Sequence, residues 1–363
     1  MSDGARVTGN LDTVQRPRSN GRGGWHASHP PEARGDRGGA TYAALDLGTN
    51  NCRLLVARPA GEGFRVIDAF SRIVRLGEGV SGSGRLSEIA IARAIEALAV
   101  CHSKMKNRGV TRARLIATEA CRMAENCEEF CARVRDGVGF ELEIVDRETE
   151  ATLAAVGCTP LIDPEADGVI LFDIGGGSSE LVRLGRPQPT RRGPPRPQIK
   201  SWASLPVGVV TLAERHGGVR VSRASFEAMV DEISEHVDRF AAANGQDLSR
   251  LHLLGTSGTV TTIAGVHLDL PRYDRRRVDG CWMSEVEVTG VVERLMEMSY
   301  EDRAANPCIG HERADLVLAG CAILEAIRRA FPCERLRVAD RGLREGMLIE
   351  LMRADGVWGH EAQ

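Results

Sequence analysis

The sequence predicts an α/β protein made of two duplicated lobes that face each other across a central cleft. Residues 43–57 (AALDLGTNNCRLLVA) and 170–183 (ILFDIGGGSSELVR) share one pattern, a strand, an Asp-x-Gly turn and a second strand. Such self-similarity indicates an internal duplication. Strands alternate with amphipathic helices after each copy, which is typical of an α/β fold with mixed sheets.

The 363 residues divide into a tail and two lobes. Residues 1–40 are rich in Gly and Arg and lack apolar periodicity, so we expect a disordered tail. The first lobe is predicted over 41–160 and the second over 161–340. A terminal helix at 342–353 is expected to pack back on the first lobe.

The first lobe is predicted to open with three strands. Ser87 is the predicted N-cap of an amphipathic helix that runs to residue 106 and is ended by Gly109. Two more helices are expected at 125–135 and 148–156. The predicted strands of this lobe are 42–47, 52–58, 64–70, 114–117 and 141–145.

The second lobe is predicted to open with the second copy of the strand, turn and strand pattern. Its strands are expected at 169–172, 179–184, 251–254 and 336–338. Its helices are expected at 222–243, after the turn at 255–259, and at 284–298 and 313–331, before the terminal helix. The segment 183–200 (RLGRPQPTRRGPPRPQIK) interrupts a hairpin, and it is consistent either with an extended basic arm that contacts a polyanion or with a disordered loop.

Composition narrows the function classes. The chain has 47 basic and 50 acidic residues and a net charge of −3, which excludes a strongly basic nucleic-acid binder. The sequence contains neither an apolar run of about 20 residues, the length a membrane span needs, nor an apolar signal region. Its ten cysteines form no CxxC pair, so we expect reduced thiols in a cytoplasmic protein rather than disulfides or a zinc site.

The two Asp-x-Gly turns carry the chemistry of a phosphate and metal site. Asp46 and Asp173 end their strands, and a carboxylate there is a hard oxygen ligand for Mg²⁺. Glycines after each Asp let backbone N–H groups approach a phosphate closely. The turn at Gly175–Gly177 is not a Walker loop, which needs a Lys, nor a dinucleotide turn, which needs a helix to follow. The candidate phosphate ligands of these turns are Gly48, Thr49, Asn50, Gly175, Gly176, Gly177 and Ser178.

A third Gly-rich turn follows the strand at 251–254 and opens a helix. Its candidate phosphate ligands are Gly255, Ser257 and Gly258, because free N–H groups at a helix N-terminus bind anions. Taken alone, the same residues are equally consistent with ordinary helix capping.

Charged residues near the turns complete the candidate set. Arg53 follows the first turn and Arg122 follows the strand at 114–117, where guanidinium groups match phosphate oxygens. Glu148 and Glu150 begin the helix at 148–156. Two positions apart, they point to different faces of that helix, so we expect at most one to act as the base that activates water.

Seven segments together resemble the exopolyphosphatase/guanosine pentaphosphate phosphohydrolase (Ppx/GppA) family, whose members have the ribonuclease-H-like lobes of the actin/sugar-kinase/Hsp70 superfamily. They occur in the order of that family and cover most of the chain after residue 42. The segments are 43–57, ATEACRMAEN (117–126), IVDRETEATLAAVG (144–157), 170–182, SLPVGVVTL (204–212), LLGTSGTVTTIAGV (253–266) and VADRGLREGML (338–348).

The resemblance implies hydrolysis of the terminal phosphoanhydride of inorganic polyphosphate, with Mg²⁺, or Mn²⁺ in its place. It places the catalytic carboxylate at Glu150, the metal-site aspartates at Asp46 and Asp173, and the phosphate-facing arginines at Arg53 and Arg122. It also implies a homodimer. The sequence resembles the short members of the family, which lack a C-terminal helical extension with a His-Asp motif.

Three alternatives stay open at this point. The first is hydrolysis of the 5′-phosphate of guanosine pentaphosphate (pppGpp), which offers the same kind of bond. The second is an ATP-binding kinase or an actin-like filament protein, and the acidic segment around Glu150 favours hydrolysis over it. The third is a phosphate- or alarmone-binding regulator without catalysis. Specific nucleic-acid or membrane partners are not expected.

Overall fold

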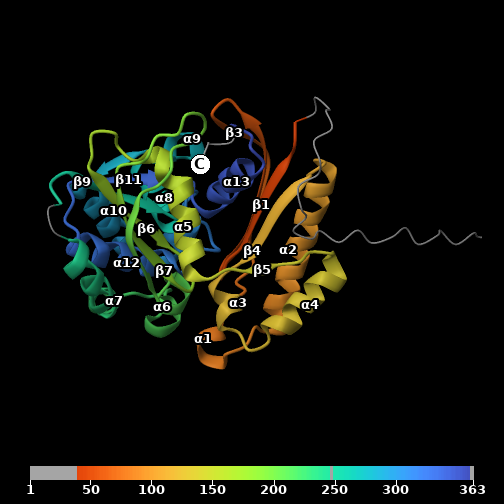
Figure 1. The fold of residues 1–363 in the computed structure, drawn as a ribbon. Coiled ribbons are helices and arrows are strands. Elements are labelled where there is room, and N and C mark those ends of the chain that lie inside the picture. Colours follow the sequence, from red (N-terminus) through yellow and green to blue (C-terminus); the bar gives the residue numbers. More distant parts are fainter. Residues whose placement is uncertain (1–38, 246–247, 360–363) are drawn as a thin grey trace, which may run out of the picture.

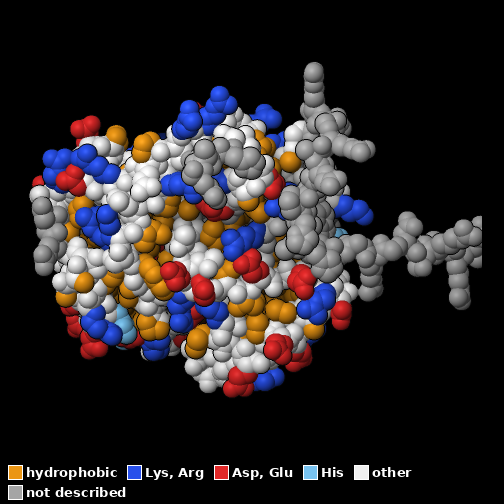
Figure 2. All heavy atoms as spheres, viewed as in Figure 1, with side chains coloured by type: hydrophobic (Ala, Val, Ile, Leu, Met, Phe, Trp, Pro, Cys, Tyr) orange, Lys and Arg blue, Asp and Glu red, His pale blue; other side chains and the backbone are white. Residues whose placement is uncertain are grey.

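A computed structural model describes residues 39–245 and 248–359 and shows two lobes, each built on one sheet (Figure 1). Most of the tail expected over 1–40 lies outside the described residues. Within the described ranges, no helix has the length and apolar character needed to span a membrane. Side chains of both charge signs are interspersed over the face shown in Figure 2, in keeping with the near balance of charges.

The first lobe has a five-stranded sheet in the order β3-β2-β1-β4-β5. β1 runs antiparallel to β2 and parallel to β4. The two faces of β1 are both apolar: Ala43 and Leu45 pack with α2 and α4, while Tyr42 and Ala44 face α13. The elements are β1 (Tyr42–Leu47), β2 (Asn51–Ala60), β3 (Gly63–Ile73), α1 (Val80–Ser83), α2 (Glu88–Asn107), β4 (Arg112–Ala117), α3 (Glu119–Met123), α4 (Cys127–Val138) and β5 (Glu143–Ile144).

The second lobe has a six-stranded sheet in the order β10-β11-β9-β6-β7-β8. One face, which includes Ile170 and Phe172, forms the largest apolar core with the helices of this lobe. The elements are β6 (Gly168–Ile174), β7 (Ser179–Gly185), β8 (Ile199–Leu205), α6 (Val209–His216), α7 (Arg223–Asn244), β9 (Leu251–Thr256), α8 (Gly258–His267), α9 (Arg275–Val278), β10 (Trp282–Ser284), α10 (Glu285–Glu297), α11 (Tyr300–Ala305), α12 (Val317–Ala330) and β11 (Arg335–Ala339).

The predicted duplication is confirmed by the sheets. Read from its other edge, the second sheet has the order β8-β7-β6-β9-β11-β10, and its first five strands match β3-β2-β1-β4-β5 of the first sheet. In each lobe the first strand pairs antiparallel with the second and parallel with the fourth. The α/β fold with two duplicated lobes is therefore the fold of this chain.

Two helices lie between the sheets and join the lobes. α5 (Arg147–Cys158) leads through a short 3-10 turn (Thr159–Leu161) into the second lobe and packs on β6, β7 and β8. α13 (Leu343–Ala354) leaves the second lobe and packs on β1, β2 and β4 of the first. The two helices also pack on each other, so each sheet is covered by a helix that connects it to the other lobe.

Glycine allows this helix pair to approach closely. A Cβ on Gly157 would lie 2.0 Å from the backbone oxygen of Gly342, and a Cβ on Gly346 would lie 1.9 Å from that of Leu153. Both distances are far inside van der Waals contact with backbone atoms that cannot rotate away. Any side chain at either position must therefore push α5 and α13 apart.

We expect Gly346→Ala to lower the free energy of unfolding by about 1–3 kcal/mol, because overpacking outweighs the gain in helix propensity. Thermal unfolding followed by circular dichroism measures the change. Gly290→Ala is the matched control, since Gly290 lies within α10 with open space around its Cβ position, and it should stabilise by about 0.5–1 kcal/mol. Equal changes in the free energy of unfolding for Gly346→Ala and Gly290→Ala would contradict the close approach of α5 and α13.

The basic segment at 183–200 is folded in the structure. It comprises the end of β7, a turn with a bridge between Gln188 and Arg196, and the start of β8. Arg353 of α13 donates to the backbone oxygens of Pro194 and Pro195 at 2.7 and 3.1 Å. The turn thus packs on the end of α13 and lies away from the residues that line the main cavity.

Candidate active site

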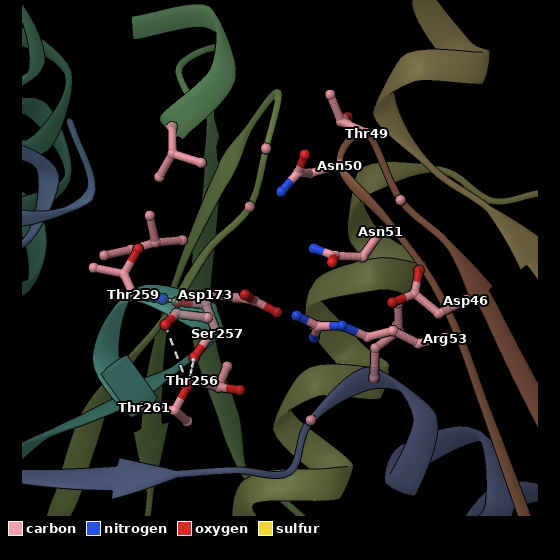
Figure 3. A pocket seen from close by; sticks show the side chains of 18 of the residues that line it. Asp46, Thr49, Asn50, Asn51, Arg53, Asp173, Thr256, Ser257, Thr259 and Thr261 are labelled. Carbon is pink, nitrogen blue, oxygen red and sulfur yellow. Dashed lines mark hydrogen bonds between the residues drawn. The ribbon is translucent and has the colours of Figure 1, made fainter. Parts of the chain in front are cut away.

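A cavity of about 510 Å³ lies between the lobes and is lined by residues of both. The three Gly-rich turns of the sequence meet there, together with the start of α5 and the start of α13. Figure 3 shows Asn50, Asn51 and Arg53 pointing into this space from the first lobe, with Asp173 and Ser257 opposite them.

The first turn is a tight hairpin between β1 and β2. The backbone N–H of Gly48 donates to the oxygen of Asn51 at 2.9 Å, which closes the turn. Asp46 pairs across the two strands with Arg53, so both side chains project from the end of the sheet. Arg53 extends across the cavity toward Asp173 (Figure 3). Its guanidinium, which belongs to the first lobe, therefore lies near the second lobe.

The second turn has the same construction between β6 and β7. The N–H of Gly175 donates to the oxygen of Ser178 at 3.0 Å, and Asp173 pairs across the strands with Glu180. A Cβ on Gly176 would lie 2.9 Å from the Cβ of Thr49 in the first turn. The two turns are therefore in direct contact, and glycine is needed at this contact.

The third turn joins β9 to α8. Ser257 accepts a hydrogen bond from the N–H of Thr259 at 3.2 Å and has a φ of 123°, an uncommon value for a residue other than glycine. Ser257 and Gly258 line the cavity, so the N-terminus of α8 faces it. Gly255 does not line it: a Cβ there would lie 2.5 Å from Cζ of Phe172, which shows that its role in β9 is packing.

Glu150 lies in the first turn of α5 and lines the cavity, whereas Glu148 is exposed and points elsewhere. The helix is capped by Asp146, which accepts from the N–H of Thr149 at 2.7 Å. Burial raises the pKa of Glu150 to about 7, with Arg122 opposing the rise. The cleft removes water from this side chain, and the pKa rise from burial exceeds the lowering that a helix N-terminus gives a carboxylate.

Arg122 is placed behind Glu150 and does not line the cavity. Its guanidinium donates to Oε2 of Glu150 at 2.8 Å, to Oε2 of Glu119 at 2.7 Å and to the backbone oxygen of Val145 at 2.7 Å. Its donors are thus directed to protein acceptors. In this structure Arg122 contacts the carboxylate of Glu150 instead of lining the cavity, which differs from the prediction that it faces phosphate.

Further carboxylates gather with Glu150. Burial raises the pKa of Asp173 to about 6 against the opposing charge of Arg53, and burial likewise raises the pKa of Asp46. Burial also raises the pKa of Glu180 well above its usual value, with Glu150 and Asp173 adding to the rise. Perturbed acids in one cleft are typical of a functional site.

The donor set suits a hard cation. Two amide oxygens, Oδ1 of Asn50 and Oδ1 of Asn51, are buried without a hydrogen-bond partner, and both residues line the same cavity as Asp46 and Asp173. Among the described residues, no three His, Cys, Asp or Glu side chains converge as a metal cluster. Mg²⁺ needs only one or two carboxylates together with phosphate and water oxygens, so Asp46 and Asp173 with these amide oxygens fit it.

The cavity is also lined by charged residues that were not candidate site residues, and Glu180, Arg313 and Arg344 are three of them. The Cβ position of Gly258 lies 3.6 Å from Nη1 of Arg313 and 3.9 Å from Nη2 of Arg53, so these guanidinium groups converge at the start of α8. Arg344 lies in the motif at 338–348 and Glu180 lies in the repeated hairpin at 170–183. Both could therefore have been selected as candidate site residues from the sequence. Arg313 lies outside the quoted motifs, and only the fold brings it to the site.

Two lobes of one topology, whose Asp-x-Gly turns touch and line a cavity with several carboxylates, define a two-lobed α/β protein. The chain belongs to the Ppx/GppA phosphatase family, whose profile matches residues 55–355.

Two curated relatives illustrate the range of this family. The guanosine-5′-triphosphate,3′-diphosphate pyrophosphatase of Photobacterium profundum is 27% identical over 316 residues, which are 86% of this chain and 59% of that protein. The chain thus spans little more than half the length of that relative. Exopolyphosphatase 2 of Mycobacterium tuberculosis is 27% identical over 330 residues, which are 85% of this chain and 98% of that protein.

The fold is shared with a solved structure of the family. The crystal structure of the Aquifex aeolicus member superposes with a TM-score of 0.73 at 26% sequence identity. The alignment covers 89% of this chain and 99% of that one.

Proposed function

We propose that the protein hydrolyses the terminal phosphoanhydride of inorganic polyphosphate and releases orthophosphate with the help of Mg²⁺. One observation carries this proposal: a carboxylate with a pKa of about 7, Glu150, faces the cavity in which three phosphate-type turns meet. A base that works near neutral pH needs such a pKa. Glu150 is also the residue that the family resemblance implies as the catalytic carboxylate.

In the proposed reaction, Glu150 accepts a proton from a water molecule whose oxygen forms a bond to the terminal phosphorus. The bond from that phosphorus to the bridging oxygen breaks, and this oxygen leaves with the electron pair on the shortened chain. The N–H groups of the Gly48 and Gly175–Gly177 turns and the guanidinium of Arg53 bind the phosphate oxygens. Asp46 and Asp173 would hold Mg²⁺, which when bound offsets negative charge on those oxygens.

A second candidate substrate, pppGpp, is favoured by one wall of the cavity. Ile309, Leu316 and Val317 are apolar and line it next to Arg313. Polyphosphate has no apolar part that such a wall would contact, whereas a nucleoside has one. A relative named for a guanosine substrate supports the same candidate.

Phosphate release from polyphosphate and from pppGpp, measured with and without Mg²⁺, tests the proposal. We expect release from at least one of them, lost when Mg²⁺ is removed by a chelator. The ratio of the two kcat/KM values assigns the preferred substrate. Tight binding of pppGpp without release of phosphate from either compound would contradict hydrolysis and favour a regulator.

A further inference from the structure

Two sets of polar contacts join the lobes outside the cavity. Arg75, in the segment after β3, donates to Oδ2 and Oδ1 of Asp315 at 2.9 and 3.0 Å and to the backbone oxygen of Glu312 at 3.1 Å. Glu214 of α6 accepts from the N–H of Gly79 at 2.9 Å and from Oγ of Ser81 at 2.6 Å. Figure 1 shows α1 and α6 adjacent where the lobes meet, at the opposite end from α13.

Arg75 is held in place by its own lobe. Its φ is 46°, which is uncommon for a residue with a side chain. Its N–H donates to the oxygen of Asn50 at 3.0 Å, and Arg93 donates to its oxygen at 3.2 Å. This backbone conformation directs the guanidinium at the second lobe, where it meets a carboxylate in a two-point contact that is only partly exposed.

These contacts are connected to the phosphate turns on both sides. The N–H groups of Val74, Arg75 and Gly77 all donate to the backbone oxygens of Thr49 or Asn50 in the first turn. In the second lobe, Asp315 lies two residues after Arg313, which lines the cavity. Separation of Arg75 from Asp315 would therefore move the first turn relative to the guanidinium at the start of α8.

We propose that Arg75 with Asp315, and Glu214 with Gly79 and Ser81, form a clamp that holds the two lobes closed on a bound phosphate. None of the clamp residues lines the cavity. They are positioning residues, because they keep the turn at Thr49 against Gly176 and keep Arg53 near Arg313. The kinetic part of this inference rests on the proposed function, whereas the closure itself does not.

The closure is tested on the full chain without substrate by hydrogen exchange. Arg75→Ala and Asp315→Ala should each increase deuterium uptake in peptides that cover 46–51 and 173–178. Arg114→Ala is the control, because Arg114 makes a comparable two-point pair with Glu143 inside the first lobe, and it should leave those peptides unchanged. Unchanged uptake in the Arg75 and Asp315 variants would overturn the clamp whether or not the protein is a hydrolase.

Exchanging the two charges of the Arg75–Asp315 pair distinguishes the effect of a clamp from the effect of a general loss of stability. We expect each single variant to raise KM roughly threefold to tenfold with little change in kcat, and the double Ala variant to be no worse than either one. Arg75→Asp combined with Asp315→Arg should recover at least half of the lost affinity and of the lost protection. Additive single effects, or a swap no better than its single components, would show that the pair does not act across the cleft.

Discussion

Glu150→Gln should lower kcat for phosphate release by roughly 10²- to 10⁴-fold, the range that loss of a general base produces. Glutamine keeps the size of the side chain and a hydrogen-bond acceptor for Arg122, but it accepts no proton from water. Substrate binding by the turns is unchanged by this substitution, so KM should change little. The measurement is initial-rate kinetics of the variant and the wild type on the preferred substrate with Mg²⁺.

Glu148→Gln is the matched control for this variant. Glu148 begins the same helix two residues earlier, is exposed and does not line the cavity. Its substitution removes one negative charge from the same region and should leave kcat within about twofold, as expected of a surface change. A large loss in Glu148→Gln, or normal turnover in Glu150→Gln, would show that the base has been assigned to the wrong residue.

The wild-type rate should also depend on pH in a defined direction. The pKa of Glu150 is raised to about 7, and the base must be ionised to accept a proton. The rate should therefore be low at pH 5.5 and increase as the pH passes through 7. A flat profile from pH 5.5 to 8 would contradict a base with this pKa.

Local sequence signals were sufficient for most of the fold. Ser87 and Ser222 cap their helices in the structure, and a cap needs only its own helix start. β8 and β10 were not predicted. β8 follows the Pro-rich turn of the basic segment, and β10 is a three-residue strand that pairs with β11 far along the chain. Such elements depend on partners distant in sequence, which a local pattern does not contain.

In the candidate site too, residues in short local motifs were predicted, whereas contacts between distant parts of the chain were not. The turn residues were found because their chemistry lies in short motifs, and all of them except Gly255 line the cavity. The partners of Arg122 were not predicted, because Glu150 is 28 residues away in the chain. The raised pKa of Glu150 was not predicted for a related reason: it comes from burial and from the charges of Asp46 and Asp173, which a helix start seen in isolation does not show.

Arg122→Ala should lower the rate at pH 7 roughly fivefold or more and move the pH profile to higher pH. The charge and the hydrogen bond of Arg122 lower the pKa of Glu150 and so oppose the rise that burial causes. Loss of Arg122 therefore raises the pKa of Glu150 further. Each unit of such a rise lowers the ionised fraction about tenfold below the pKa. Activity should then recover in part at pH 9, which the pH dependence of kcat measures.

The recovery at high pH is what distinguishes positioning of Glu150 from direct contact with phosphate. If Arg122 bound substrate, its loss would raise KM at every pH and leave the profile in place. Arg147→Ala is the control, because Arg147 donates to Glu119 at 2.6 Å and Glu119 is also bound by Arg122. Arg147→Ala removes one partner of the Glu119 carboxylate but leaves the contact between Arg122 and Glu150. The pH profile of this variant should therefore match that of the wild type. An equal shift in both variants would mean that Glu119, and not Arg122, sets the pKa of Glu150.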